Sequence, residues 1–253
     1  MSEDRYRILA LNGGRVTGNG GWRFDLPVVA EGYADAQIDD YGRSATRRAY
    51  PWGPGTRLRL RARFSHAAGE LVGTAGFGFW NAPFGDPTVR WPALPQAAWF
   101  FYASAPTDLP LPAAGPGRGW FAATLDATTP AALSLAPLAP LALLLHQVPA
   151  VRRRLWPWIR RRLGISFAPL PGVMTAWQAY ELAWTGRGVV FWVNGRVVLQ
   201  TPHAPRGPLG FVCWLDNQYL VATPTGRLGW GTLPVPAPQW MEVADLRLGA
   251  DGQ

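Results

Sequence analysis

The sequence predicts an all-β fold, a sandwich of two sheets that carries one helical insertion. Glycine (29 residues) and proline (25 residues) are scattered between short apolar runs, which is typical of many turns and short strands. Residues 57–64 alternate strictly between arginine and apolar side chains, as expected of a half-buried strand. After Thr129 the composition changes to leucine, alanine and proline, and strands resume near Thr175. We therefore predict one sandwich domain over residues 1–253, with a helical insertion at 128–172.

The composition excludes several kinds of site. With 253 residues, 48% of them hydrophobic, the chain can bury a full core and belongs to the folded class. Cys213 is the only cysteine, which excludes an intramolecular disulfide and every cysteine-based zinc site. The chain has only three histidines, which does not favour a metal centre or a catalytic triad. We expect His146 and His203 to face solvent beside proline-rich loops.

The basic charge is concentrated in one segment. The formal net charge is +8, and all 24 basic residues are arginine. Six of these arginines lie at 152–154 and 160–162, and the rest of the chain is nearly balanced. Nucleic acid is therefore not an expected partner, because the charge marks one segment and not a face of the domain.

The N-terminus favours a cytoplasmic protein. Its first residues, MSEDRYRILALNGG, are acidic where a signal peptide needs basic residues, and they lack a long apolar stretch. The apolar segment 130–150 is barely long enough to span a bilayer and is interrupted by Pro137 and Pro140. A peripheral position at a membrane surface remains open through the insertion.

Three strands are predicted in the first half, at residues 57–64, 74–81 and 97–104. The arginine row of the first strand has two interpretations, and a solvated outer face is favoured over an anion-binding stripe. In the second strand Gly76 and Gly78 fall on the face of Trp80, so a neighbour or a ligand can approach the backbone closely there.

Residues 151–163 predict a basic amphipathic helix, kinked at Pro157 and ended by Gly164. Four interpretations stay open for it: a packed helical cap, a lid, a surface for a protein partner, or an anchor on an anionic membrane. The residues that would serve as lid or anchor are Arg153, Arg154, Trp156, Trp158, Arg160 and Arg161.

The second half contains a clear hairpin. Asn194 and Gly195 separate the apolar runs 189–193 and 196–201, which is the strongest short hairpin signal. The run 176–184 precedes them, and further strands are predicted at 209–219 and 240–248.

This order of strands resembles the concanavalin A-like lectin and glucanase superfamily, in particular family 16 glycoside hydrolases. The resemblance is carried by YELAW at 180–184 with VFWVNG at 190–195, by PLGFVCW at 208–214 and by WMEVADLRL at 240–248. It implies a jelly-roll β-sandwich with a concave groove. In this family an aspartate of the closing strand often helps to bind a structural calcium, which makes Asp245 a candidate ligand, although the residues alone favour an exposed carboxylate. No other cofactor is expected.

The sequence departs from the family at the catalytic strand. Family members carry Glu-x-Asp-x-(x)-Glu after the strand that ends in Phe-Trp, because retaining hydrolysis needs two carboxyl groups about 5 Å apart. Here residues 96–104 read QAAWFFYAS and contain no carboxylate. The resemblance therefore implies the sandwich and its groove, and the departure argues against glycosidase activity by the family mechanism.

Aromatic residues and one polar strand end are the candidates for binding. Flat aromatic faces hold sugar rings or apolar ligands through a large contact area, although packing between the sheets is the alternative for each ring. The polar residues 216–218 interrupt a buried strand and indicate either a ligand contact or a plain turn. The candidate ligand-binding residues are Trp80, Asn81, Trp99, Tyr102, Trp214, Asp216 and Asn217.

One carboxylate pair can be constructed for acid/base work. Asp39 and Asp40 are adjacent and point to opposite faces of a strand, so one of them can share a site with Asp216.

The leading functional hypothesis is a non-catalytic binding protein that holds a carbohydrate or an apolar small molecule in an aromatic groove. The alternatives are an enzyme of the same fold, acting on a glycan or an isoprenoid-like substrate with Asp39, Asp40 or Asp216, and a membrane-associated scaffold.

Overall fold

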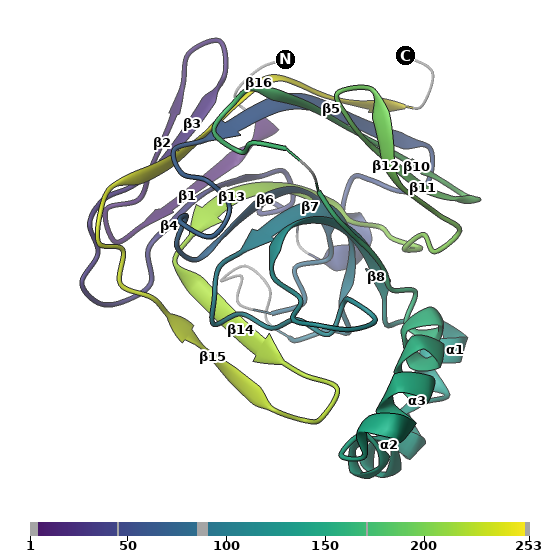
Figure 1. Cartoon of the computed structure of the whole chain (residues 1–253). Helices are drawn as coiled ribbons and strands as arrows, with labels where there is room; N and C mark the ends of the chain where they lie inside the picture. The colour runs from purple at the N-terminus through teal and green to yellow at the C-terminus, as the bar shows by residue number, and fades with distance from the viewer. Residues whose placement is uncertain (1–4, 45, 85–90, 171, 251–253) are drawn as a thin grey trace.

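A computed structural model describes residues 5–44, 46–84, 91–170 and 172–250. Two seven-stranded antiparallel sheets pack face to face, and a small hairpin and a group of helices lie together at the lower end in Figure 1. The prediction of an all-β sandwich with a helical insertion is confirmed.

The first sheet, sheet A, contains most of the strands that surround the candidate site. In spatial order its strands are β1 (Arg7–Leu11), β4 (Asp35–Asp39), β13 (Gly210–Asp216), β6 (Thr74–Trp80), β7 (Gln96–Ala103), β8 (Gly119–Asp126) and β9 (Ser166–Pro169).

The second sheet, sheet B, covers the other side of the core. Its order is β12 (Arg196–Thr201), β11 (Gly188–Val193), β10 (Gln178–Thr185), β5 (Thr56–Phe64), β16 (Gln239–Ala250), β3 (Trp22–Leu26) and β2 (Arg15–Gly18). The predicted turn between β11 and β12 is confirmed, because Asn194 and Gly195 have φ values of 50° and 74°.

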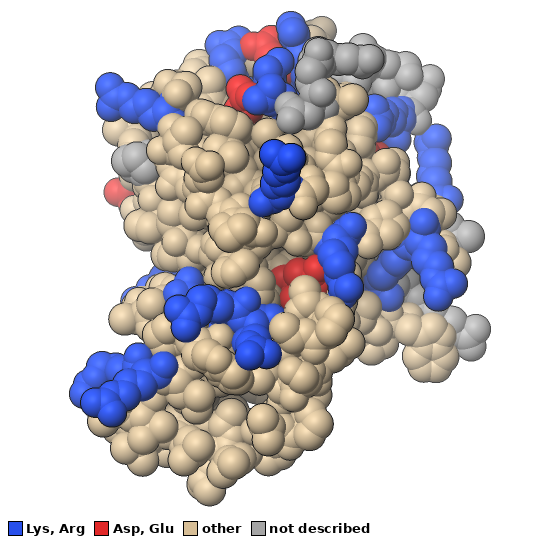
Figure 2. Space-filling view, turned by 90° about the vertical axis from the view of Figure 1, so that its right-hand side faces the viewer, with Lys and Arg blue, Asp and Glu red and all other residues tan. Residues whose placement is uncertain are grey.

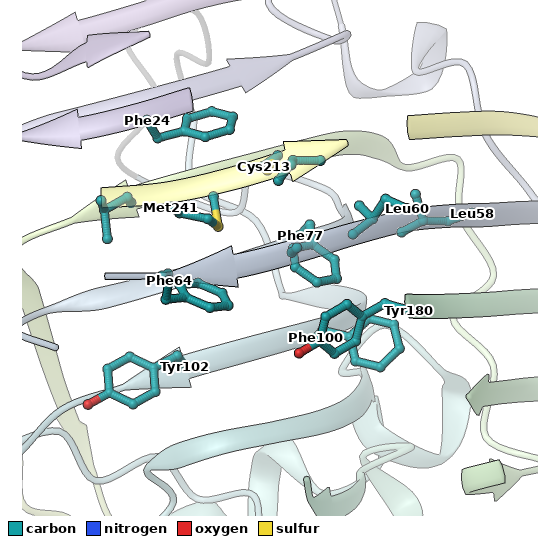
Figure 3. Packing of buried hydrophobic residues seen from close by; sticks show 14 of the residues in the cluster. Phe24, Leu58, Leu60, Phe64, Phe77, Phe100, Tyr102, Tyr180, Cys213 and Met241 are labelled. Carbon is teal, nitrogen blue, oxygen red and sulfur yellow. The ribbon is translucent and has the colours of Figure 1, made fainter. Parts of the chain in front are cut away.

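The core lies between the sheets and is rich in aromatic side chains (Figure 3). Phe77 and Phe100 of sheet A have ring centroids 5.4 Å apart, and each ring lies 5.1 Å from that of Tyr180 in sheet B. Cys213 is fully buried in this core, and burial raises the pKa of its thiol well above the ordinary value. Its thiol therefore stays protonated and unreactive.

The arginine row of β5 lies on the outer face of sheet B, where acidic and aromatic neighbours occupy it. Arg57 and Arg59 pair with Glu181 at 2.8 and 3.4 Å, and Arg63 pairs with Glu242 at 2.7 Å. The interpretation of this row as an outer face, with paired charges, therefore fits the structure better than an open anion-binding stripe.

The helical insertion connects β8 to β9, which are neighbours in sheet A. Its elements are α1 (Pro130–Leu133), the 3₁₀ turn η3 (Ala136–Leu138), α2 (Ala139–Leu145) and α3 (Pro149–Arg162); a further 3₁₀ turn, η2 (Arg47–Ala49), lies elsewhere. The predicted boundary at 172 is too late, because β9 already belongs to the sheet and packs Phe167 against Phe121, with ring centroids 4.9 Å apart. α3 runs through Pro157 as one helix.

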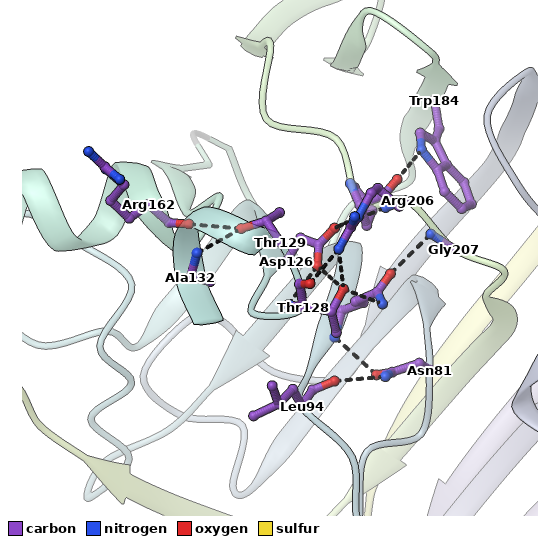
Figure 4. Close-up of polar contacts among 12 residues, drawn as sticks. Asn81, Leu94, Asp126, Thr128, Thr129, Ala132, Arg162, Trp184, Arg206 and Gly207 are labelled. Atoms are coloured by element: carbon purple, nitrogen blue, oxygen red, sulfur yellow. Dashed lines mark hydrogen bonds and ion pairs between the residues drawn. The ribbon is translucent and has the colours of Figure 1, made fainter. Parts of the chain in front are cut away.

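Polar contacts hold the base of the insertion to the sandwich (Figure 4). The buried carboxylate of Asp126 accepts hydrogen bonds from the backbone N–H of Thr128 at 2.9 Å and of Arg206 at 3.1 Å. Thr129 caps α1, because its Oγ1 accepts from the N–H of Ala132 at 3.0 Å and donates to the carbonyl of Arg162 at 3.2 Å. Within the described residues, no helix is both long and apolar enough to span a bilayer.

The small hairpin, β14 (Gln218–Ala222) and β15 (Leu228–Thr232), reaches the helices at its turn. His146, predicted to face solvent, is instead 2% exposed, because its Nδ1 lies 2.8 Å from the carbonyl oxygen of Pro224 in that turn. The Nε2 of Gln147 donates to the carbonyl of Thr225 at 2.9 Å. Helices and hairpin therefore form one continuous end of the molecule.

Candidate functional site

The outer face of sheet A carries a continuous group of aromatic side chains. Neighbouring ring centroids within this group lie 4.9 to 6.1 Å apart. We call the group the aromatic floor, and its members are Trp80, Trp99, Phe101, Phe121, Phe167 and Trp214. Of these, Trp80, Trp99, Phe101 and Phe167 are half-buried and keep surface that a ligand could contact.

Strand register explains why the rings meet. Trp214 of β13 lies opposite Gly76 of β6, Gly76 lies opposite Phe101 of β7, and Phe101 lies opposite Phe121 of β8. The glycine leaves room for the indole of Trp214, since a Cβ at Gly76 would lie 2.8 Å from its Cη2. The bare backbone predicted at Gly76 is thus filled by a neighbouring side chain.

The three indoles of the floor differ in their hydrogen bonds. Trp80 Nε1 donates to the hydroxyl of Tyr41 at 2.8 Å, and Trp214 Nε1 donates to Thr74 Oγ1 at 2.9 Å. Trp99 Nε1 is buried and has no acceptor among the described residues. A buried N–H without an acceptor costs about 1–3 kcal/mol, so an oxygen placed beside Trp99 would be stabilised.

Acidic side chains of β4 and β13 border the floor. Asp216 lies directly opposite Asp35, so the two residues form a cross-strand pair on one face. Asp39 lies on the same face of β4, four residues after Asp35. Its carboxylate accepts hydrogen bonds from Arg7 Nη2 at 2.7 Å, from Gln37 Nε2 at 3.0 Å and from the N–H of Gly42 at 2.7 Å. Asp39 therefore ties β4 to Arg7 of β1 and to the turn at Gly42.

Burial changes the protonation of the cross-strand pair. Burial raises the pKa of Asp216 to about 6, although the N–H groups of Gln218 and Thr74 and the hydroxyl of Thr74 oppose the rise. Burial, followed by the charge of Asp216, raises the pKa of Asp35 well above its ordinary value. One edge of the floor thus holds two buried carboxyl groups whose pKa values are both raised.

Asp40 faces away from this edge, as its position next to Asp39 predicts. Its carboxylate accepts from Trp52 Nε1 at 2.6 Å and from the N–H of Phe211 at 2.8 Å. Burial raises the pKa of Asp40 to about 6. Of the two adjacent aspartates, only Asp39 lies on the face of Asp216.

The loop before β8 packs on part of the outer face of sheet A and joins the hairpin and the helices there. The loop that contains Asp108 pairs with β14, because the N–H of Asp108 donates to the carbonyl of Leu220 at 3.0 Å. Leu111 of the same loop packs beside Phe121. Trp156 of α3 donates from Nε1 to the carbonyl of Pro112 at 3.0 Å. Loop, hairpin and helices together therefore form a connected cover.

Comparisons with known proteins identify the fold of this chain but no family. The sequence matches no protein-family model, and no curated protein matches it. Among solved structures, Crh5 transglycosylase in complex with NAG is similar with a TM-score of 0.52 and 11% identity over 100% of this chain and 81% of that chain. Apo Crh5 transglycosylase gives a TM-score of 0.50 and 12% identity with the same coverage. The chain has the concanavalin A-like jelly-roll fold. This confirms the fold that the sequence resemblance implies.

Within the jelly roll, some predicted binding residues do not belong to the floor. Tyr102 is fully buried on the core side of β7, where its hydroxyl donates to the carbonyl of Leu71 at 2.8 Å. The prediction that Tyr102 lies beside the ligand groove is therefore wrong. Asn81 is 5% exposed and ties β6 to β7, because its Oδ1 accepts from the N–H of Gln96 at 3.0 Å and its Nδ2 donates to the carbonyl of Leu94 at 2.9 Å.

Asn217 is a second structural clamp. It is fully buried, its Oδ1 accepts from the N–H of Ala34 at 2.8 Å, and its Nδ2 donates to the carbonyls of Gly32 and Leu233 at 2.9 and 2.8 Å. These contacts use both ends of the amide, so Asn217 has little left to offer a ligand.

Sequence reasoning missed Asp35, Phe101, Phe121 and Phe167. The signal that finds two of them is strand alternation: Phe101 is two residues from Trp99, and Asp35 is four residues from Asp39. The same rule places Tyr102 on the other face. Phe167 lies on an edge strand hidden in the helical insertion, so alternation within the main strands does not reach it.

The described residues contain no group of three or more His, Cys, Asp and Glu side chains arranged to hold a metal ion. Asp245, the candidate calcium ligand, lies on the outer face of sheet B, where Arg61 Nε contacts its carboxylate at 2.6 Å. The carboxylate thus pairs with a guanidinium in this structure, and a role of Asp245 in binding calcium stays a prediction. A shallow depression of about 350 Å³ lies beside it, and Arg59, Arg61 and Glu181 line it. At its walls Arg59 pairs with Glu181 and Arg61 pairs with Asp245.

Proposed function

We propose that this protein binds a small molecule with a flat apolar face, a carbohydrate ring or an apolar compound, on the aromatic floor and does not transform it. The observation that carries the proposal is the floor itself, where half-buried Trp80, Trp99 and Phe101 lie side by side. Rigid rings provide a large contact area at low conformational cost. β7 crosses the centre of the floor and contains no carboxylate.

The polar groups around the floor favour a ligand that also carries oxygen. Trp99 Nε1 lacks an acceptor among the described residues, and Arg7 and Gln37 border the floor, both held in place by Asp39. A sugar ring combines an apolar face with hydroxyl oxygens, which suits this arrangement. The solved complex of Crh5, a structural neighbour, with NAG supports a carbohydrate ligand.

The test is a glycan array combined with a panel of fatty acids and isoprenoids, followed by titration of each hit with tryptophan fluorescence. We expect Trp99→Ala to weaken binding of the ligand at least about tenfold, since central aromatic residues dominate binding energy. Trp177→Ala is the matched control, because Trp177 is a 38% exposed indole on the outer face of sheet B.

Two results would overturn the proposal. The first is a blank array and a blank panel at high protein concentration. The second is a ligand whose affinity is unchanged in Trp99→Ala or is lost equally in Trp177→Ala.

A second candidate is an enzyme that acts on a glycan or an isoprenoid-like substrate by acid/base catalysis. The observation that favours it is the cross-strand pair of Asp35 and Asp216, because burial raises the pKa of both carboxyl groups and a raised pKa suits a general acid. Both side chains are buried, so a substrate must displace part of the cover to reach them.

Turnover of a glycan panel tests this candidate. Product formation that disappears in Asp35→Asn would favour it. Turnover that survives Asp35→Asn combined with Asp39→Asn, Asp40→Asn and Asp216→Asn would remove it. Binding without any turnover in the unmodified protein would favour the binding proposal.

A further inference from the structure

The end of the molecule formed by the helices and the small hairpin exposes an unusual amount of apolar surface. Leu144 of α2 is 69% exposed, and Leu228 and Trp230 of β15 are 73% and 75% exposed. We call this surface the apolar tip, and its members are Leu138, Leu141, Leu144, Leu145, Val148, Leu228 and Trp230. Large exposed apolar patches mark interaction sites in soluble domains.

The two parts of the tip are held together. Besides the contacts of His146 and Gln147 with the hairpin turn, a Cβ at Gly226 would lie 3.3 Å from Leu143 Cδ2, so α2 and the turn are in close contact. A single flat partner could therefore touch both parts at once.

The apolar arc predicted for the basic helix is largely turned inward, although its Trp158 is 37% exposed. Trp156 and Ile159 of α3 are 7% and 9% exposed, because they pack toward the sandwich and the loop of Pro112. α3 turns its arginines outward instead, and Arg153, Arg154, Arg161 and Arg162 are exposed. The apolar contact that a membrane anchor needs is thus supplied by α2 and β15, and the charge is supplied by α3.

The chain segments that form the tip carry basic residues and no acidic ones. No acidic residue occurs between Asp126 and Glu181, where six arginines lie, and none occurs between Asp216 and Glu242, where Arg227 lies. Figure 2 shows arginine side chains gathered above a lower tip that carries no charged side chain on that face. An apolar tip with arginines above it on this face matches the two layers of an anionic bilayer, acyl chains below and phosphates above.

We propose that this end of the protein docks on an anionic lipid surface, with the leucines of α2 and Trp230 at the boundary between headgroups and acyl chains and the α3 arginines at the phosphates. The charge complementarity favours anionic lipid over a second copy of this chain, because two such ends would bring like charges together. This docking is independent of the ligand proposed for the aromatic floor.

Co-sedimentation with vesicles tests the proposal. We expect the protein to bind vesicles of 30% phosphatidylserine in phosphatidylcholine at 50 mM salt, to leave them at 500 mM salt, and to bind pure phosphatidylcholine weakly, because screening shortens the reach of the arginines. Combined Arg153→Gln, Arg154→Gln and Arg161→Gln should weaken partitioning at least about 100-fold, at about 1 kcal/mol for each charge. Combined Leu141→Gln and Leu144→Gln should weaken it as well.

A matched control separates local from overall charge. Arg15→Gln, Arg187→Gln and Arg196→Gln remove three exposed charges from sheet B and its turns, so they change the net charge equally. We expect this control to keep its binding. Circular dichroism confirms that every variant is folded.

Four results would overturn the proposal. They are equal binding to both kinds of vesicle, binding to neither, an equal loss in the sheet B control, and a concentration-dependent dimer in sedimentation velocity that Leu144→Gln abolishes. The last result would assign the apolar tip to a second copy of this chain.

Discussion

Replacing Gly76 with alanine should lower the free energy of unfolding and disturb the packing of the aromatic floor. A Cβ at Gly76 would lie 2.4 Å from the carbonyl oxygen of Phe100 and 2.8 Å from the ring of Trp214, against an ordinary contact of about 3.4 Å or more. β7 must therefore shift by about 1 Å, which costs about 3 kcal/mol as overpacking. Tilting the Trp214 indole away from Thr74 adds about 1 kcal/mol for the lost hydrogen bond. Urea denaturation should show a loss of about 4 kcal/mol in the free energy of unfolding.

The control is Gly249→Ala in β16. Gly249 is also a strand glycine, and nothing lies within 4 Å of the position that its Cβ would take. This variant should be neutral or slightly stabilised, because alanine lowers the entropy of the unfolded chain. A difference below about 1 kcal/mol between the two variants, or an unchanged near-ultraviolet circular dichroism spectrum in Gly76→Ala, would refute the packing described for the floor.

Further predictions concern the edge of the floor and one turn. Folding raises the pKa of Asp216 from 3.8 to about 6, so the free energy of unfolding should fall by about 3 kcal/mol in total as pH rises through this range. Asp216→Asn should flatten this part of the pH dependence of the urea midpoint. Asn217→Ala should cost about 3 kcal/mol in thermal or urea unfolding, since it leaves several buried backbone groups without partners. Gly195→Val should lower the free energy of unfolding by about 1–3 kcal/mol through backbone strain alone, because Gly195 has a positive φ and nothing crowds its Cβ. The control is Gly186→Val, which should cost less, because Gly186 also has open space around its Cβ but no positive φ.

The elements that the sequence predicts well are those where a local pattern decides the structure. The strict alternation of 57–64 became β5 over Thr56–Phe64, and the Asn194–Gly195 pair became the turn that joins β11 to β12. In both cases the information lies within a few consecutive residues, so no knowledge of distant contacts is needed.

The candidate site depends on contacts between distant segments, and the sequence predicts it less well. Asp35 opposes Asp216 only because β4 pairs with β13, and the two residues are far apart in the chain. His146 is buried because the hairpin turn and Trp156 of α3 both pack against it. Tyr102 could have been placed correctly, because it is three residues from Trp99 and strand alternation puts the two side chains on opposite faces. The partners of Asp35 and His146, in contrast, depend on which distant segments pair in the fold.

The buried state of Cys213 has a practical consequence for labelling. Because this thiol is fully buried and holds its proton, maleimide and nitroxide reagents should leave the folded protein unmodified. A cysteine introduced at an exposed position such as Leu144 or Trp230 would then be the single reactive thiol in the chain. Spin or fluorescent probes can therefore be attached one site at a time, and immersion depth or distances measured, without first removing a native cysteine.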